Sequence, residues 1–227
     1  MISHILKRLA KMEIRKLKEE QLKLAKKVIV KDDFSEIKLI GGCDVAYTAD
    51  ELVAVVVVLE YKTLKVVEVK RVTDKPKFPY ISTLLCYRES PAINEACSQL
   101  ENRPDLLMCD CHGIAHPLRI GCASHIGLLL DIPTIGVAKK ILCGDLDEGK
   151  LFVDGEHRAT LLHTRKFSNP LIVSPGHRIT LKTSLEIVKH CIKDGSKLPE
   201  PLRLAHKFSV KKRRELKNNN CPGENSK

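Results

Sequence analysis

The spacing of hydrophobic positions changes along the chain, and each change predicts a different kind of element. Over residues 2–28, apolar side chains recur at roughly helical spacing among many charged ones, which predicts one or two amphipathic helices with a basic outer face. Further along, β-branched residues become frequent. That region predicts three strands joined by short polar connections as antiparallel hairpins, at residues 37–47, 52–60 and 64–72.

The second of these strands is apolar throughout from Ala54 to Leu59. A strand covered on both faces has this pattern, so we expect it to be buried and central. After a loop at 73–88 that enters a short helix or strand, the pattern alternates. Helices are predicted at 90–101, with Ser90 as cap and Pro91 in the first turn, at 117–130 and near 180–193. The intervening strands are predicted at 106–110 and 133–139 and near 150–160 and 171–175.

Three antiparallel strands followed by alternating helices and strands indicate an α/β fold, with a mixed central sheet flanked by helices. The chain has 227 residues, of which 43% are hydrophobic, and this suits one domain with a real core. We expect that domain to span 1–210, with the amphipathic helical N-terminus at 1–28. A basic and then polar tail at 211–227 is expected to be partly disordered.

The net charge indicates the class of binding partner, and the cysteines indicate the cellular compartment. A net charge of +11 predicts a polyanionic partner, with nucleic acid favoured over anionic membrane and over a merely soluble basic surface. There is neither a secretory signal nor an apolar run of about 18 residues, so no membrane segment is expected. Nine cysteines cannot all pair within one chain, and several lie in apolar segments. We therefore expect reduced thiols and a cytoplasmic location.

Residues 108–125, MCDCHGIAHPLRIGCASH, hold many potential metal ligands. Structural zinc sites are commonly built from C-x-x-C pairs, and the chain contains none. Adjacent strand residues also point to opposite faces, which separates the side chains of Cys109 and Asp110. We expect Cys109, Cys111 and Cys122 to act as small buried apolar residues and not as zinc ligands.

Three acids interrupt apolar surroundings, where a carboxylate is costly unless it is paired or bound to a cation. Asp44 lies on the first strand, Glu89 follows LLCYR, and Asp110 closes the strand LLMCD. If the strands of Asp44 and Asp110 are neighbours, both carboxylates reach one ion. A few oxygens together with water and substrate phosphate suit Mg²⁺. The alternative is that each acid caps a turn or pairs with a local lysine or arginine.

Longer motifs carry a resemblance to a known family. GGCDVAY, FPYISTLLCYRES, DCHGIAHPLRIGCASHIGLLLDIPTIGVAKKIL and LPEPLRLAH together resemble endonuclease V, the deoxyinosine-directed nucleases, from about residue 15 to 209. The resemblance implies an RNase H-like fold, in agreement with the strand order above. It also implies a monomeric DNA-repair enzyme that uses Mg²⁺, with Mn²⁺ as a substitute. Such an enzyme cuts the second phosphodiester bond 3′ to a deaminated base, in DNA with deoxyinosine or in RNA with inosine.

The resemblance also assigns roles to residues. Asp44 and Asp110 would bind the metal, and Glu89 would be the third catalytic acid. Lys139, in VAKK, would lie near the scissile phosphate, and His206, in RLAH, would lie near the metal centre.

The remaining positions of the resemblance concern the substrate. Tyr80, in PYIS, would be a wedge that enters the duplex beside the lesion, where an aromatic ring fills the gap left by an extruded base. Pro79 would stiffen its loop. Ignoring the resemblance, the interpretation of Tyr80 as a half-buried core aromatic is the favoured one. The further expected substrate-binding residues are Ile81, Leu85, Gly113 and His116.

Three positions depart from the family pattern. Ser82 stands where the family usually has proline, Cys111 where it has glycine, and Leu118 where HPRR has arginine. Ser82 would make the wedge loop less stiff, Cys111 would alter the base pocket, and Leu118 would remove one phosphate-facing charge. None of them removes an expected metal ligand.

Two other functions remain open from the sequence. A non-enzymatic nucleic-acid-binding module on the same fold explains the charge but not the embedded acids. Another RNase H-like nuclease, such as a junction resolvase, explains the acids, but it would need a dimer for paired cuts and would not need Tyr80 as a wedge.

Overall fold

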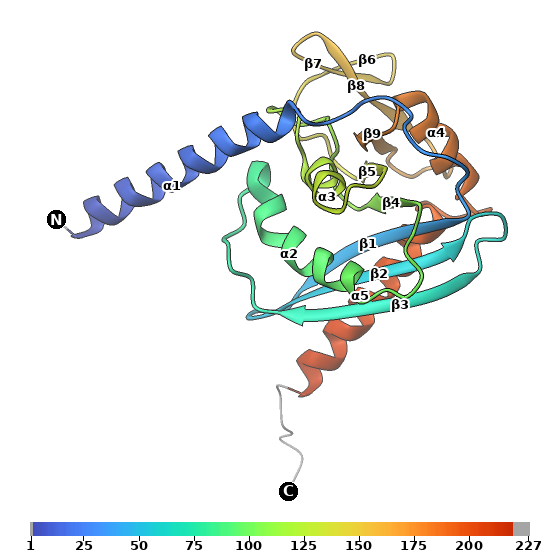
Figure 1. The fold of residues 1–227 in the computed structure, drawn as a ribbon, viewed down its shortest axis with the longest axis horizontal. Coiled ribbons are helices and arrows are strands. Elements are labelled where there is room, and N and C mark those ends of the chain that lie inside the picture. The colour runs from blue at the N-terminus through green and yellow to red at the C-terminus, as the bar shows by residue number, and fades with distance from the viewer. Residues whose placement is uncertain (1, 220–227) are drawn as a thin grey trace, which may run out of the picture.

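The strands of the described residues, 2–219, form one nine-stranded sheet in the computed structural model (Figure 1). The strand order is β3-β2-β1-β4-β5-β9-β8-β7-β6. In chain order the strands are β1 (Leu39–Tyr47), β2 (Leu52–Glu60), β3 (Val66–Asp74), β4 (Leu106–Cys109), β5 (Thr134–Ala138), β6 (Asp145–Asp147), β7 (Lys150–Val153), β8 (Glu156–Leu162) and β9 (Leu171–His177). The helices are α1 (Ile2–Ala25), a 3₁₀ turn (Ser82–Leu84), α2 (Leu85–Ser98), α3 (Cys122–Leu130), α4 (Leu181–His190) and α5 (Glu200–Asn219).

The sheet is mixed, as the sequence predicts. Strands β1, β2 and β3 pair antiparallel, whereas β4 pairs parallel with β1 and β5 pairs parallel with β4. Beyond β5, the strands β9, β8, β7 and β6 are joined by antiparallel pairing. The expected α/β fold with a mixed central sheet is therefore confirmed.

Helices cover both faces of the sheet, and β2 shows why its sequence is apolar without interruption. Val53, Val55 and Val57 belong to the core beneath α4 and α5, whereas Ala54 and Val56 belong to the core beneath α2 and α3. Alternate strand residues point to opposite faces, so both sets must be apolar. The strand is covered on both faces as expected, although it lies next to the edge strand β3 and not at the middle of the sheet.

Helix α2 begins earlier than predicted. It starts at Leu85, so Ser90 is not its cap, and Pro91 lies inside the helix. The Ser90 hydroxyl instead donates a hydrogen bond of 2.6 Å to the Cys86 carbonyl. The helix extends past Pro91 because the buried side chains of Ala92, Ile93 and their neighbours hold it against the sheet, which outweighs the local proline cost.

Other element boundaries also differ, each for a local reason. Strand β3 begins at Val66 because Leu64 is a turn residue with φ of 54°. Helix α3 begins at Cys122 and not at 117, because Arg119 has a left-handed φ of 57° and Gly121 is extended, so neither continues a helix. The region 150–160 is a hairpin of β7 and β8, turned at Asp154 and Gly155, both of which have positive φ.

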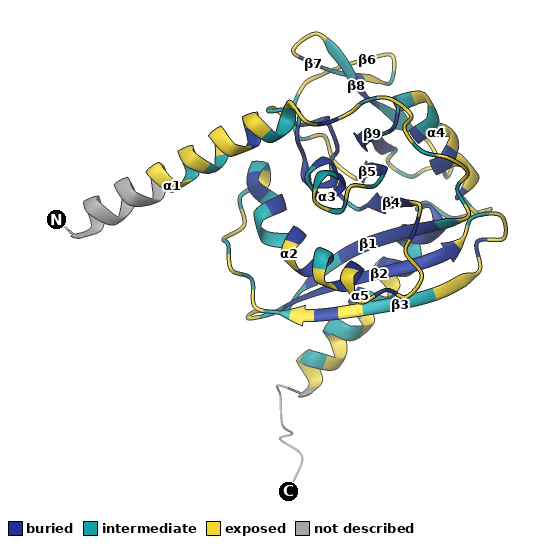
Figure 2. Cartoon of the chain, in the orientation of Figure 1, coloured by how far each residue is buried: buried dark blue, intermediate teal, exposed yellow. Residues whose placement is uncertain are grey.

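Helix α1 projects from the body of the molecule and carries mostly exposed side chains over the part of it that is described (Figures 1 and 2). The residue Gln21 anchors it, because its buried amide donates 2.9 Å to the Thr83 carbonyl. Within the described part of the chain, no helix combines the length and apolarity needed to cross a membrane.

Helix α5 runs across residue 210, where the sequence predicts the start of a tail. Residues 211–219 are its last turns, and 220–227 lie outside the described residues, so the expected disorder there is not addressed. Leu202, Ala205 and Ser209 are buried along the helix face that packs on β1 and β2. Gly42 of β1 permits this approach, since a Cβ there would lie 2.4 Å from the Pro201 carbonyl group.

Replacing Gly42 by alanine should push α5 away from β1. Overpacking of this kind costs about 1–3 kcal/mol, which corresponds to a Tm lowered by roughly 3–10 °C in a domain of this size. Thermal unfolding followed by circular dichroism measures the change, with the exposed Glu36→Ala as the control. A Gly42→Ala protein with the wild-type Tm would contradict the close contact.

Candidate active site

The carboxyl ends of β1, β4 and β5 meet at one edge of the sheet and bring three expected site residues together. Cys43 of β1 pairs with Cys109 of β4, so the next residues on the two strands, Asp44 and Asp110, are side by side. The backbone N–H of Asp110 donates 3.3 Å to the Cys43 carbonyl. Lys139 follows directly after β5. The expectation that the strands of Asp44 and Asp110 are neighbours is confirmed.

Helix α5 adds side chains from the opposite direction. His206 Nδ1 lies 3.2 Å from Asp44 Oδ2, and the Ser209 hydroxyl donates 2.5 Å to the same oxygen. Positions three apart on a helix share a face, so one turn of α5 supplies both groups. Among the described residues, Asp44, Asp110 and His206 form the one group whose three potential metal-ligand atoms lie within 4.8 Å of one another.

Lys139 forms an ion pair with Asp110 Oδ2, which offsets part of the repulsion between the two adjacent carboxylates. Burial raises the pKa of Asp110, the Lys139 ammonium lowers it, and the nearby Asp44 raises it again, with a net upward direction. One lysine therefore does not compensate fully for the burial of this acid beside a second one. A cation at this edge would favour the ionised form of both.

Glu89 reaches the same edge from α2. It lines one small cavity, of about 10 Å³, together with Asp44 and Asp110. Burial and the charges of Asp44 and Asp110 raise the pKa of Glu89 to about 7, although the Tyr47 hydroxyl donates 2.7 Å to Oε1 and favours the ionised form. The Arg88 guanidinium lies 4.7 Å from the centre of the Tyr47 ring. All three embedded acids are thus close together.

A hollow of about 290 Å³ opens over the metal-ligand group. Its lining includes Tyr47, Lys139, His206, Val210 and Arg213. Sequence reasoning missed Tyr47, Ser209 and Arg213 as site residues. Helical periodicity contains the signal for two of them, because 206, 209 and 213 recur on one face of a helix.

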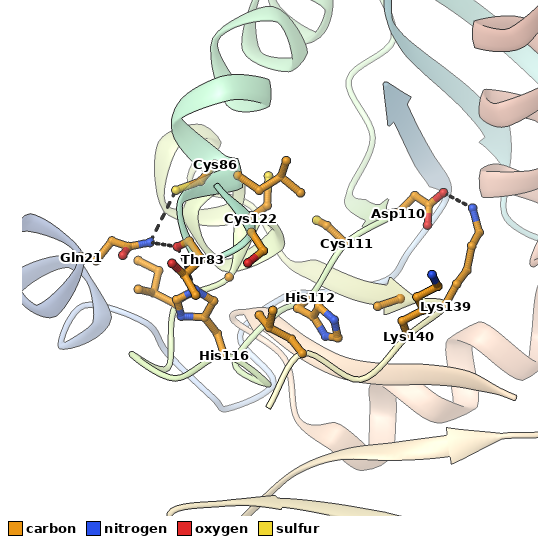
Figure 3. A pocket seen from close by; sticks show the side chains of 16 residues that line it. Gln21, Thr83, Cys86, Asp110, Cys111, His112, His116, Cys122, Lys139 and Lys140 are labelled. Carbon is orange, nitrogen blue, oxygen red and sulfur yellow. Dashed lines mark hydrogen bonds and ion pairs between the residues drawn. The ribbon is translucent and has the colours of Figure 1, made fainter. Parts of the chain in front are cut away.

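A second and larger pocket, of about 340 Å³, lies beside this hollow and shares Asp110 and Lys139 with it (Figure 3). The ion pair of Asp110 and Lys139 is at one end, and the Gln21 hydrogen bonds to Thr83 and Cys86 are at the other. Apolar and polar side chains line it, among them the expected residue Leu85 and also Ser82, Cys111, His112, His116, Cys122, Lys140 and Leu142.

His116 in this pocket is neutral and is hydrogen-bonded to the backbone. Leu118 N–H donates 3.1 Å to His116 Nδ1, so the proton is on Nε2, which donates 3.0 Å to the Thr83 carbonyl. Burial lowers the pKa of His116 to about 4. His116 therefore supports the pocket wall, and it lies apart from the metal-ligand group Asp44, Asp110 and His206.

Gly113 also has a packing role. Its N–H donates 2.9 Å to the Ser174 hydroxyl, and a Cβ would lie 1.9 Å from the Pro175 carbonyl oxygen. It is not among the residues that line the pocket.

The segment that precedes α2 presents Tyr80 to solvent. This side chain is 68% exposed, so the alternative of a half-buried core aromatic is wrong. Pro79 is exposed as well, and Ile81 accepts a hydrogen bond of 2.8 Å from Leu84 N–H at the start of the 3₁₀ turn. Arg88 supports the segment by donating to the Phe78 carbonyl.

The cysteines of residues 108–125 are buried among apolar neighbours. A thiol hydrogen bond with Cys109, together with burial, raises the pKa of Cys111, and a bond with Cys111, together with burial, raises that of Cys122. Both side chains are therefore neutral thiols, and both line the larger pocket. Cys111 occupies the position where the family pattern has glycine, so a thiol forms part of the pocket wall.

Comparison with known proteins gives a consistent result. The endonuclease V family model matches residues 22–207. Endonuclease V of Dictyoglomus thermophilum is 42% identical over 201 residues, which cover 84% of this chain and 87% of that protein. Endonuclease V of Gloeobacter violaceus is 42% identical over 212 residues, which cover 87% of this chain and 86% of that protein.

Solved structures of endonuclease V are also similar to this chain. Ciona intestinalis endonuclease V, in complex with DNA containing an inosine followed by a ribo-adenosine, is similar with a TM-score of 0.83 and 29% identity. That match covers 90% of this chain and 98% of the Ciona chain. The catalytic domain of human endonuclease V gives a TM-score of 0.82 at 29% identity, with 91% of this chain and 98% of the human chain covered. The RNase H-like class expected from the sequence is therefore confirmed, and the chain belongs to the endonuclease V family of nucleases.

Proposed function

We propose that this nuclease cuts nucleic acid strands at deaminated bases, with deoxyinosine in DNA as the main substrate, at the second phosphodiester bond 3′ to the lesion. One observation carries the proposal: the cluster of acids and the larger pocket share Asp110 and Lys139. A base held in the pocket and a phosphate at the acids would then belong to the same strand. The inosine-containing DNA bound by the Ciona relative supports this class of substrate.

The acids fit a divalent metal. Asp44 and Asp110 would hold it, since carboxylate oxygens are the ligands that Mg²⁺ prefers, and His206 at their side is compatible with Mn²⁺ as a substitute. When bound, the metal would supply charge neutralisation at the phosphodiester and a more acidic water. Ser209 and His206 hold the Asp44 carboxylate in a fixed orientation.

Glu89 and Lys139 would complete the chemistry. Glu89, with a pKa of about 7, is suited to accept a proton near neutral pH, while Tyr47 fixes its Oε1. The Lys139 side chain is 39% exposed, and its ammonium can leave Asp110 for a non-bridging phosphate oxygen. These assignments match the roles that the family resemblance implies.

The larger pocket would receive the extruded base. Enzymes that examine a base inside a duplex take it out of the stack and lose a few kcal/mol of stacking and pairing, which a mismatched or damaged base reduces. Tyr80, which is exposed just before the pocket residue Ser82, would fill the gap. Leu85, Cys111 and Cys122 would form the walls around the base.

Inosine-containing RNA is the second substrate class, since the Ciona complex carries a ribonucleotide after the inosine. We further propose that the enzyme acts as a monomer in the cytoplasm. The eight cysteines of the described residues are all free, as a reducing compartment favours.

Replacing Asp110 by asparagine should lower the cleavage rate by about 10³-fold or more, because a bound metal supplies several kcal/mol to the barrier. Binding in Ca²⁺ should change much less. Single-turnover cleavage in Mg²⁺ and fluorescence anisotropy in Ca²⁺ measure the two quantities, with the exposed Asp147→Asn as the control. A cleavage rate within tenfold of wild type would contradict the assignment of Asp110 as a metal ligand.

Replacing Glu89 by glutamine should abolish cleavage and stabilise the metal-free fold at pH 8. The folded-state pKa of about 7 is above the usual value of 4.5, so the neutral carboxyl is favoured on folding. Stability from this group is full below pH 4.5 and is lost as the pH rises through 7. Glutamine avoids that loss, so Tm in EDTA should rise at pH 8 and not at pH 4. Glu95→Gln, exposed on the same helix, should show no such pH dependence, and an equal gain at both pH values would refute the assignment.

Replacing Tyr80 by alanine should reduce cleavage of an inosine-containing duplex by about tenfold, with little change in Tm because the ring is 68% exposed. Tyr80→Phe should keep the activity. On a single strand, where no stack has to be opened, the defect should be smaller. Unchanged preference for the inosine duplex in Tyr80→Ala would instead favour a nuclease that needs no wedge.

A further inference from the structure

The loop 163–170 between β8 and β9 lies at the same edge of the sheet as the acids. Ala138, at the carboxyl end of β5, pairs with Ile172 near the start of the antiparallel β9. Leu162, at the end of β8, pairs with Leu171. Since β5 ends beside Lys139, the loop that links β8 to β9 leaves the sheet on the active-site side.

The tip of this loop holds an aromatic ring in solvent directly after two cationic residues. Phe167 is 97% exposed, and its φ of 59° is in the left-handed region that bulky side chains rarely adopt. Arg165 and Lys166 precede it and are exposed, and the Lys166 ammonium lies 5.1 Å from the centre of the ring. Because folding usually buries phenylalanine, a ring held outward in a strained conformation points to a contact with another molecule.

Side-chain hydrogen bonds fix the loop. The Ser168 hydroxyl donates 2.8 Å to the Arg165 carbonyl, and the Ser168 N–H donates 3.2 Å to the same oxygen. At the base, the Thr164 hydroxyl donates 2.7 Å to the Lys197 carbonyl, just before α5. The exposed ring is therefore displayed by an ordered turn that is tied to the segment leading to His206.

We propose that loop 163–170 is a second contact for the substrate strand, outside the base pocket. Phe167 stacks on a base, and Arg165 and Lys166 bind the flanking phosphates. An exposed aromatic beside cations is the arrangement by which proteins hold nucleic acid without reading its sequence. The inference rests on the proposed function for the identity of the partner, a nucleic acid strand, and the net charge of +11 favours the same class.

The sheet gives the distance of this contact from the acids. In the strand order, β4, β5, β9 and β8 are successive neighbours, so the two ends of the loop lie two to three strand spacings, or about 9–14 Å, from Asp110. This corresponds to about three to four base-pair steps of a duplex at 3.4 Å each. Tyr80 lies just before the pocket residues Ser82 and Thr83 in the chain, so it lies beside the base pocket and belongs to a different segment from the loop. The two exposed aromatics are therefore separate contacts for the proposed substrate strand.

Anisotropy in Ca²⁺, which separates binding from cleavage, tests the contact. The probes are a fluorescein-labelled duplex with one deoxyinosine and the matching undamaged duplex. Phe167→Ala and Phe167→Leu should raise Kd by about tenfold for both probes, whereas Phe167→Trp should stay within twofold, because stacking needs an aromatic face. Leu129→Ala, an exposed apolar residue at the end of α3, is the control and should bind as wild type. Equal Kd values for the alanine, leucine and tryptophan variants at position 167 would overturn the proposal.

Salt dependence tests the two cations. The double variant Arg165→Gln and Lys166→Gln should lower the slope of log Kd against log salt by about two, near 0.9 for each phosphate contact. The double variant Lys182→Gln and Lys189→Gln, exposed on α4, is the charge-matched control and should leave the slope unchanged. The same loss of slope in both double variants would contradict a local contact.

Shortened duplexes test the distance. Trimming the duplex to two base pairs beyond the cleavage site, on each side in turn, should abolish the difference between wild type and Phe167→Ala on one side only. A difference that survives both truncations would contradict the placement. Failure of the proposed function is separate: wild type would then bind both duplexes without cutting at inosine, while the Kd comparison at Phe167 would still be measured.

Discussion

The parallel pairing of β1 with β4 is the constraint on which the site depends. It places the Asp44 and Asp110 carboxylates side by side at the edge of a buried sheet, where like charges destabilise each other. Lys139 compensates in part, and Glu89, which shares their cavity, has its pKa raised to about 7. A divalent cation between the acids would make the arrangement favourable, so the electrostatic cost of the fold and the proposed need for a metal have the same origin.

The other parts of the site follow from how helices pack on this edge. Helix α5 approaches β1 closely because Gly42 has no side chain, and this approach brings His206 and Ser209 to Asp44. Helix α2 carries Glu89 over the opposite face of the sheet and, at its start, forms one wall of the larger pocket. The acids therefore lie between two layers, and in the proposed reaction the pocket beside them would hold a base from the strand that is cut.

Several features could be predicted from the sequence because they depend on local pattern. The apolar run of β2 required cover on both faces, and the apolar surroundings of Asp44, Glu89 and Asp110 indicated that these acids need a partner, either a shared cation or local partners. The start of α2 could not be predicted, because Ser90 and Pro91 resemble the first residues of a helix. Burial of the helix against the sheet outweighs this local preference. Arg213 was missed because 211–227 was predicted to be a tail, and Ser209 was missed because no helix was predicted around it. Only packing on β1 shows that α5 includes both residues. Tyr47 was missed because its role depends on a contact with α2, which lies far away in the sequence.

The most direct measurement is to map cleavage on end-labelled duplexes, one with a single deoxyinosine and one with a normal base, each in Mg²⁺ or in EDTA. The account predicts one nick, at the second phosphodiester bond 3′ to the inosine, that appears only with Mg²⁺ and only in the inosine duplex. Cleavage that persists in EDTA, or that is equally fast in the undamaged duplex, would contradict the link between the paired carboxylates and the base pocket.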